Sequence, residues 1–241
     1  MRPEPRLDII GAALADPTRA RILCKLMDGR AFTNKELSCA ANITPPTATA
    51  HLKQLEQAGL TTSIRSGRHV YHRVANAQVA SVLEKLSTLT PSDHVRRAAK
   101  PDSGVLLARC CYNHLAGRLG VWITDNLLDT GVLQLAHGAL APGPRHHAFL
   151  TDLDLDPPRV SAHRPVAKFC LDWTDRRNHI SGSLGIAILE KALKDKWLTR
   201  QRSSRALTIT PEGKIALTRH FGLSDSALDC LGSSVRSMAK R

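Results

Sequence analysis

Aromatic residues are scarce in this sequence and long hydrophobic runs are absent. Phe, Trp and Tyr make up 4% of the 241 residues, too few for the aromatic platforms on which RNA- and single-strand-binding proteins stack bases. No run of about 18 apolar residues is present, which excludes transmembrane helices. The first residues do not form a secretory signal, and six irregularly spaced cysteines do not suit a disulfide framework. We therefore expect a reducing, cytoplasmic location.

Common active-site motifs are also missing from the sequence. It contains no Walker loop, no Gly-x-Ser-x-Gly and no His-Glu-x-x-His, the short patterns that mark nucleotide, hydrolase and zinc-protease sites. Asp172 and Asp175 adjoin Arg176 and Arg177, so we expect ion-paired surface groups there and not a catalytic carboxylate pair. The sequence therefore predicts a protein that is not an enzyme.

Acidic residues are outnumbered by basic ones. The chain has 34 Lys and Arg against 21 Asp and Glu, a formal charge of +13. Residues 1–90 carry 12 basic and 7 acidic side chains, and residues 166–241 carry 14 and 7, so two basic ends flank a nearly neutral middle. Such an excess attracts polyanions. With few aromatics for stacking, duplex DNA is the favoured polyanion.

The first ninety residues contain several helix-start signals. Asp16 before Pro17 suits an N-cap followed by proline at the first helical position. Thr33 and Glu36 form a capping box at the start of a short third helix. A fourth helix is expected from Thr44 onward, ending near Gly59.

A β-hairpin and a final amphipathic helix are expected after these helices. Residues 61–74 (TTSIRSGRHVYHRV) are rich in β-branched side chains, with a two-residue turn at Ser66-Gly67. The whole order is that of a winged helix–turn–helix. In that fold the helix after Thr44 enters the major groove, and the hairpin, or wing, lies against the backbone or minor groove.

Three stretches of this region resemble the ArsR-type family of bacterial repressors. They are residues 16–23 (DPTRARIL), 43–60 (ITPPTATAHLKQLEQAGL) and 65–71 (RSGRHVY), and the resemblance spans about residues 5–90. It implies a homodimer that binds a palindromic operator in double-stranded DNA. It also implies that the repressor leaves DNA when a metal or another inducer binds.

Polar positions on the exposed side of the helix after Thr44 are candidate DNA contacts. Threonine can hydrogen-bond base edges or phosphates and offer its methyl group to thymine, although Thr44 also suits a cap and Thr49 also suits packing. Basic side chains at the wing tip suit phosphates or the minor groove, or a solvated turn. The candidates are Thr44, Thr47, Thr49, His51 and Lys53 on the helix, and Arg65, Arg68 and His69 on the wing.

The rest of the chain is predicted to form a linker and a second domain. Residues 91–104 are polar, with two prolines and no apolar period, which is typical of a linker. Residues 105–241 contain an internal repeat, in which 114–123 (HLAGRLGVWI) aligns with 179–188 (HISGSLGIAI) at an offset of 65. A segment that was duplicated only because the two copies pack well together would also explain the repeat.

Such a repeat suggests two packed copies of one supersecondary unit, about residues 109–160 and 168–225. Gly117 and Gly120, like their equivalents Gly182 and Gly185, lie three apart and would allow close helix contact. The expected fold is mainly α with small β-hairpins. It comprises a winged helix–turn–helix over residues 1–90 and an internally repeated helical domain that is winged-helix-like.

The second domain contains candidate metal ligands that the first domain lacks. Many ArsR-type regulators bind metal through paired cysteines on the third helix or Asp and His on the last one. Here the third helix has only Cys39, and residues 76–89 contain neither His nor Asp. In the second domain Cys111 and His114 are spaced i,i+3, one edge of a tetrahedral zinc site if both lie on one helix.

Cys170 and His179 belong to the second copy, and His179 is the repeat equivalent of His114. If the copies pack about a pseudo-twofold axis, the four residues could converge on zinc or another thiophilic metal. Residues 111–117 (CYNHLAG) and 170–174 (CLDWT) also resemble the appended domain of longer ArsR-type regulators.

Other roles for these residues remain open at this point. Cys110 with Cys111, or Cys170, could sense redox state, or the thiols and histidines could be buried structural groups. Trp122, Trp173 and Trp197 could line a pocket for a small effector between the repeats, or could fill the core.

The sequence thus predicts a homodimeric, sequence-specific transcriptional regulator. We expect a repressor that is released by an effector bound in the C-terminal domain. An alternative is an architectural DNA-binding protein without an effector, and a third is a zinc-dependent enzyme attached to a DNA-binding domain. The architectural protein would use the basic C-terminus as a second DNA contact, through Lys194, Lys196, Arg200, Arg202 and Arg205.

Overall fold

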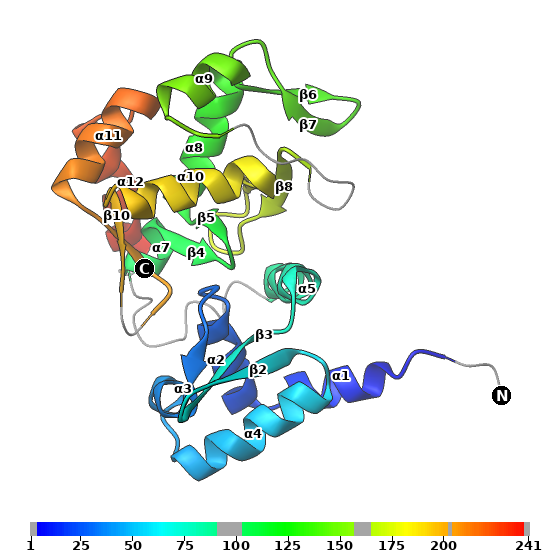
Figure 1. The fold of residues 1–241 in the computed structure, drawn as a ribbon. Helices are drawn as coiled ribbons and strands as arrows, with labels where there is room; N and C mark the ends of the chain where they lie inside the picture. Colours follow the sequence, from blue (N-terminus) through cyan, green and yellow to red (C-terminus); the bar gives the residue numbers. More distant parts are fainter. Residues whose placement is uncertain (1–3, 91–102, 157–164, 202–203, 239–241) are drawn as a thin grey trace. The chain divides into compact units, whose positions relative to one another are not determined.

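The computed structural model describes residues 4–90, 103–156, 165–201 and 204–238. The chain divides into two compact units, residues 1–83 and 84–241 (Figure 1). The predicted linker at 91–104 falls largely on residues 91–102, which lie outside the described residues. No helix within the described part of the chain is long and apolar enough to cross a membrane.

Helices of the first unit begin where their capping residues lie. The Asp16 carboxylate accepts hydrogen bonds from the amides of Thr18 and Arg19, and Thr33 with Glu36 forms the expected capping box, so both predicted starts are confirmed. Thr44 caps the fourth helix in the same way. The helices are α1 (Leu7–Leu14), α2 (Pro17–Leu26), α3 (Asn34–Ala41), α4 (Pro45–Gln57) and α5 (Ala77–Thr88), the last of which crosses the division between the units.

A three-stranded antiparallel sheet completes the winged helix–turn–helix. Its strands are β1 (Phe32–Thr33), β2 (Thr61–Ser66) and β3 (His69–Val74), in the order β1-β3-β2. Ser66 pairs with His69, so the wing turns at Gly67-Arg68, one residue later than the predicted Ser66-Gly67. Gly67 has a φ of 56°, a conformation that favours glycine and fixes this position of the turn.

The core of the first unit lies between α2, α3 and α4. Ile22, Leu26, Leu37 and Leu55 are fully buried and Leu52 nearly so. These residues recur at helical spacing, so the opposite side of α4 faces solvent. The fold thereby presents one polar face of α4 next to the wing.

In the second unit, the order hairpin, helix, hairpin occurs twice, once in each copy of the repeat. The sequence did not predict the first hairpin of either copy. Buried residues recur at the offset of 65, as in Leu119 and Leu184. The first copy consists of β4 (Arg109–Cys111), β5 (His114–Ala116), α8 (Arg118–Asp129), β6 (Leu133–Ala136) and β7 (Ala139–Pro142). The second consists of β8 (Lys168–Leu171), β9 (Asn178–Ser181), α10 (Gly182–Lys194), β10 (Leu198–Arg200) and β11 (Leu207–Ile209). Further helices are α7 (Ser103–Leu107), α9 (His146–Asp152), α11 (Pro211–Phe221) and α12 (Asp225–Met238).

The two copies pack against each other crosswise, with β5 beside α10 and β9 beside α8. The apolar cavity at their junction is lined by three residue pairs at the offset of 65, and none of the three tryptophans borders it. The pairs are Leu115 with Ile180, Gly120 with Gly185, and Ile123 with Ile188. A second pocket is bordered by Trp122, with Arg118 from the first copy and Arg177 from the second, so one of the three tryptophans does line a pocket between the repeats.

Candidate functional site

Cys111 and His114 lie on a β-hairpin and not on one helix, which corrects the sequence-based expectation. They are direct partners at the end of β4 and β5, with only Tyr112 and Asn113 between them. The i,i+3 spacing suits a helix and a two-residue hairpin turn equally well. Tyr112 takes a φ of 58°, which ends the strand and excludes a continuing helix.

The second hairpin repeats this arrangement with a longer loop. Cys170 on β8 is paired directly with His179 on β9. Directly opposite residues in an antiparallel pair project on the same face, so each hairpin presents one cysteine beside one histidine.

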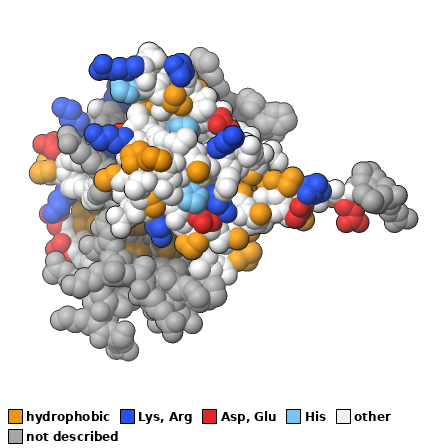
Figure 2. Space-filling model, turned by 90° about the horizontal axis from the view of Figure 1, so that it is seen from below, with side chains coloured by type: hydrophobic (Ala, Val, Ile, Leu, Met, Phe, Trp, Pro, Cys, Tyr) orange, Lys and Arg blue, Asp and Glu red, His pale blue; other side chains and the backbone are white. Residues whose placement is uncertain are grey.

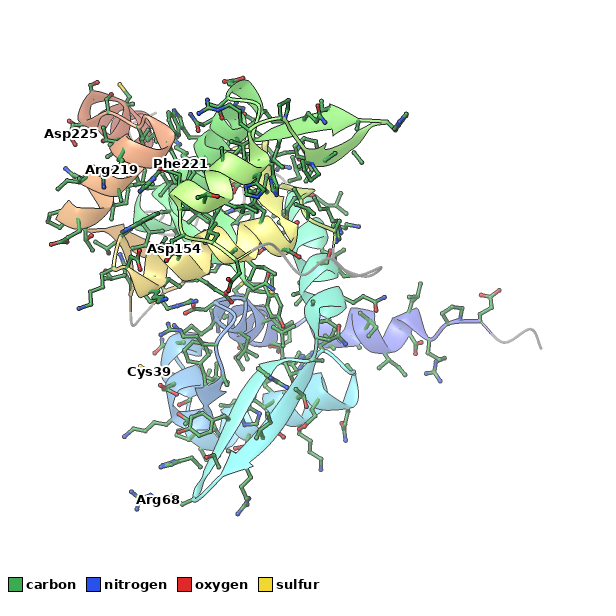
Figure 3. The ribbon with its side chains drawn as sticks, turned by 45° about the horizontal axis from the view of Figure 1, so that its top comes forward. Cys39, Arg68, Asp154, Arg219, Phe221 and Asp225 are labelled. Carbon is green, nitrogen blue, oxygen red and sulfur yellow. The ribbon has the colours of Figure 1, made fainter. Side chains whose placement is uncertain are left out.

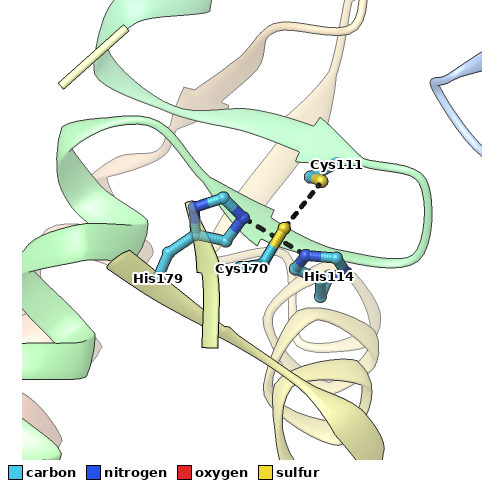
Figure 4. A group of neighbouring side chains, drawn as sticks. All are labelled: Cys111, His114, Cys170 and His179. Carbon is cyan, nitrogen blue, oxygen red and sulfur yellow. Dashed lines mark hydrogen bonds between the residues drawn. The ribbon is translucent and has the colours of Figure 1, made fainter. Parts of the chain in front are cut away.

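All four side chains converge at the junction of the two hairpins (Figure 4). The two Sγ atoms lie 3.9 Å apart, and the Nε2 atoms of His114 and His179 lie 3.2 Å apart. All four ligand atoms fall within 4.8 Å of one another. Sequence reasoning had grouped these residues, and the structure brings all of them together.

The S···S and N···N separations are close to the corresponding edges of a tetrahedral zinc site. With zinc bonds of about 2.3 Å to sulfur and about 2.05 Å to nitrogen, a tetrahedron has S···S edges of about 3.8 Å and N···N edges of about 3.3 Å. The observed separations differ from these values by about 0.1 Å. A disulfide would need sulfurs about 2.05 Å apart, and none of the six cysteines forms a disulfide.

Two glycines leave room for this convergence. A Cβ on Gly120 would lie 2.6 Å from the carbonyl oxygen of Leu115 and 3.5 Å from the Cβ of His179. In the other copy, a Cβ on Gly185 would lie 2.7 Å from the carbonyl oxygen of Ile180 and 3.5 Å from the Cβ of His114. Each copy therefore accommodates the histidine of the other at a glycine.

The four groups influence one another's protonation. Burial raises the pKa of the Cys111 thiol well above its ordinary value. Hydrogen bonds from Cys111, His114 and His179 lower the pKa of Cys170 far below its usual range. Burial lowers the pKa of His114. Burial also acts to lower that of His179, but contacts with Asp172 and Cys170 outweigh it and raise the pKa to about 9. Metal ligands must be deprotonated, so an ion here would displace protons from Cys111 and His179.

Asp172 is not a surface group, contrary to the sequence-based expectation. Its side chain is fully buried and forms an ion pair with the equally buried Arg109, at 2.8 Å. Arg109 also lies over the ring of Trp173, 4.7 Å from its centroid. The sequence offered one indication that Asp172 lies near the site, namely its position between Cys170 and His179. The neighbouring Arg176 and Arg177 suggested an ion pair with the wrong residues.

Cys110 stands apart from the cluster. Adjacent residues on a strand project on opposite faces, and the Cys110 Sγ accepts a hydrogen bond from Nη1 of Arg200 at 3.0 Å.

On α4, the candidate DNA contacts differ in how many hydrogen bonds their side chains already form within the chain. The Thr44 hydroxyl caps the helix and lies 2.8 Å from the Thr47 hydroxyl. Thr49 donates to the carbonyl of Pro45 and accepts from Asn34. The ring of His51 is half-buried, with Nδ1 3.5 Å from Arg19 and 4.0 Å from Asp16. Thr47 and Lys53 are exposed.

The basic candidates of the wing stand in solvent. Arg65 and His69 are exposed on the strands, and Arg68 lies at the tip of the hairpin, pointing away from it (Figure 3). Viewed from below, Lys and Arg side chains are spread over the visible face and are not confined to one patch (Figure 2).

Residues 16–63 match the family described as bacterial regulatory protein, arsR family. Over 222 residues the chain is 36% identical to the uncharacterized HTH-type transcriptional regulator YdfF of Bacillus subtilis (strain 168), covering 91% of this chain and 98% of that protein. The chain belongs to the ArsR family. It is a DNA-binding transcriptional regulator of the winged helix–turn–helix type.

Two further relatives match about a third of the chain. The HTH-type transcriptional repressor SmtB of Mycobacterium tuberculosis (strain CDC 1551 / Oshkosh) is 37% identical over 86 residues, 34% of this chain and 63% of that protein. The NMR structure of the cadmium metal-sensor CMTR from Mycobacterium tuberculosis is 35% identical, with a TM-score of 0.29, and the match covers 33% of this chain and 81% of that one.

Proposed function

We propose that this ArsR-family regulator is a cytoplasmic, homodimeric repressor whose second unit binds zinc or another thiophilic divalent metal and releases DNA in response. The observation that carries the proposal is the convergence of two Cys–His pairs from separate hairpins, with their four ligand atoms within 4.8 Å of one another. Two thiolates and two imidazoles suit zinc and its thiophilic relatives better than magnesium or calcium, which prefer oxygen.

The ion would join the two copies of the repeat. Cys111 and His114 would hold it from the first hairpin, and Cys170 and His179 from the second. Because neither hairpin alone supplies four ligands, binding would stabilise one arrangement of the copies over others. A metal-dependent change of this kind in the second unit is the switch that we infer.

In this proposal, exposed side chains of α4 and the wing contact DNA. Thr47 and Lys53 would face the major groove, while Arg65, Arg68 and His69 would contact phosphates or the minor groove. The hydrogen bonds of Thr44 and Thr49 within the chain, and the contact of His51 with Arg19, suit residues that fix the start of the helix and its packing against neighbouring elements.

Dimer formation would cover apolar side chains that a single chain exposes. Leu7 is 73% exposed and Ile9 44% exposed on α1, and Val82 is 48% exposed on α5. A second copy of the chain would remove these groups from water. Two recognition helices related by a twofold axis would then read a palindrome with half-sites about one helical turn apart.

The test combines metal content with DNA affinity. Protein purified under reducing conditions is compared with a Cys111→Ser/Cys170→Ser variant by elemental analysis, and both are titrated with DNA from upstream of the protein's own gene, with and without zinc. We expect about one zinc per chain in the wild type only, and zinc-dependent loss of DNA affinity in the wild type only. A Cys24→Ser/Cys39→Ser variant, with exposed cysteines in the first unit, should behave as wild type.

Two results would overturn the proposal. Wild-type protein that takes up no zinc, cadmium or cobalt would remove the metal site. Protein that binds metal with unchanged affinity for DNA would leave the site a structural one and remove the switch.

A further inference from the structure

The loop between the two ligands of the second hairpin differs from that of the first. Only Tyr112 and Asn113 separate the first Cys–His pair, whereas Leu171 and Asn178 still pair and residues 172–177 follow as a loop. The loop is closed by a hydrogen bond from the Asp172 amide to the carbonyl of Arg177, at 2.8 Å. This hydrogen bond fixes the conformation of the loop at Asp172, whose side chain is fully buried.

Both copies of the repeat contact this carboxylate. From the first copy, Oδ2 accepts hydrogen bonds from Nη2 of Arg109 and from the amide of Gly117, each at 2.8 Å. From its own loop, Oδ1 accepts from the amides of Thr174 and Asp175, at 2.9 and 3.1 Å. A carboxylate that accepts this many hydrogen bonds in the protein interior stays ionised, and Arg109 balances its charge.

One further contact points to the metal site. Nδ1 of His179 lies 3.3 Å from Oδ2 of Asp172, an ion-pair contact that lacks hydrogen-bond geometry, while Nε2 of the same ring lies 3.2 Å from Nε2 of His114. An ionised carboxylate beside Nδ1 favours the ring form that carries its proton there, which leaves the Nε2 lone pair free for a metal. The corresponding partner of His114 is a neutral acceptor, the Asn113 Oδ1 at 3.3 Å from its Nδ1.

We propose that Asp172 is a positioning residue that fixes the tautomer and orientation of His179 for metal binding, and that His114 is the more weakly held of the two imidazole ligands. This rests on the proposed metal site. Asp172 would act through His179 and would not itself be a ligand. Arg109 and Gly117 of the first copy hold the Asp172 carboxylate in place. The orientation of His179 in the second copy therefore depends on how the first copy packs against it.

Zinc affinity, measured by competition with a chromophoric chelator, tests the proposal in the full-length protein. Asp172→Asn keeps the size of the side chain but removes its charge, and should weaken zinc binding about 10- to 100-fold, the range found for partners behind metal-bound histidines. Asn113→Ala removes the neutral acceptor beside His114 and should change affinity by less. Equal affinity of Asp172→Asn and wild type would overturn the proposal.

A second measurement separates positioning from a general effect on folding. In the zinc-loaded wild type, ¹⁵N NMR of the histidine rings should show His179 bound through Nε2 and protonated at Nδ1. Binding through Nδ1 of His179 would overturn the role of Asp172 even if Asp172→Asn failed to fold. Wild-type protein that binds no zinc would instead refute the proposed metal site, so the two failures are distinguishable.

Discussion

At the scale of single residues, the three threonines of α4 show how hydrogen bonding inside the protein limits what a side chain can contact. Thr44 caps the helix, and Thr49 bonds to the carbonyl of Pro45. All three side chains are exposed, but the Thr47 hydroxyl hydrogen-bonds only with that of Thr44 among the described residues. It can turn toward a base edge by giving up this single contact, whereas Thr49 is held both as a donor and as an acceptor. Sequence spacing placed all three on the exposed side and could not make this distinction.

Two substitutions separate base recognition from phosphate contact. Thr47→Ala should weaken binding to the operator by about 1–3 kcal/mol and affect random duplex little, because a base-edge contact is lost. Arg68→Ala should weaken binding to both DNAs and lower the salt slope by about 1. Fluorescence anisotropy at several salt concentrations measures both effects. Gln78→Ala, an exposed position on α5, is the control and should bind as wild type.

The opposite pattern would reassign these residues. Equal losses on operator and random duplex for Thr47→Ala would make it a phosphate contact. An unchanged salt slope for Arg68→Ala would leave the wing tip in solvent.

At the scale of elements, helices with strong local signals were predictable, whereas the leading hairpin of each copy was not. Asp16 and the Thr33–Glu36 pair satisfy free amides from within a few residues, so their effect is visible in the sequence. The hairpin of Cys111 and His114 has strands of three residues, and three residues cannot show a period of two. Its stability comes from packing against the other copy, which no local pattern reveals.

The pairing of Asp172 escaped prediction for the same reason. Its partner Arg109 lies 63 residues earlier in the chain, and Arg176 and Arg177 were nearer in sequence. Sequence could suggest that the four ligands converge, because the repeat relates His114 to His179. The sequence could not show that the buried carboxylate of Asp172 lies beside one of these ligands, His179.

Close packing at Gly120 gives a test of how α8 and β5 of the first copy position His114. In Gly120→Ala the new methyl group would lie 2.6 Å from the Leu115 carbonyl oxygen, and strand β5, which carries His114, would have to move. We expect a loss of about 1–3 kcal/mol of stability together with weaker zinc binding, measured by denaturant unfolding and chelator competition.

Gly232→Ala is the matched control in the same unit. It lies in α12 with nothing within 4 Å of an added Cβ, so it should be neutral or stabilising by up to about 1 kcal/mol. If Gly120→Ala proved as harmless as Gly232→Ala, the close approach of α8 to β5 would not constrain the site.

At the scale of the whole molecule, the proposed function depends on a second copy of the chain. One winged helix–turn–helix reads one half-site, and linking two such modules raises affinity for a palindrome by about 10²- to 10⁴-fold without any new contact. Helix α1 extends from the rest of the first unit (Figure 1) and exposes Leu7 and Ile9. In the proposed homodimer these side chains are covered by the partner.

Leu7→Lys/Ile9→Lys should therefore separate the two copies. Burying two lysine charges in an apolar interface is unfavourable, so sedimentation equilibrium should find monomer at concentrations where the wild type is a dimer. The variant should retain affinity for an isolated half-site and lose the gain of about 10²- to 10⁴-fold on the palindrome. Asp8→Ala, which changes an exposed polar side chain of the same helix, controls for α1 itself. A variant that stayed dimeric would place the interface elsewhere. One that lost half-site binding as well would show that α1 supports the fold of the first unit and does not serve only to join two copies.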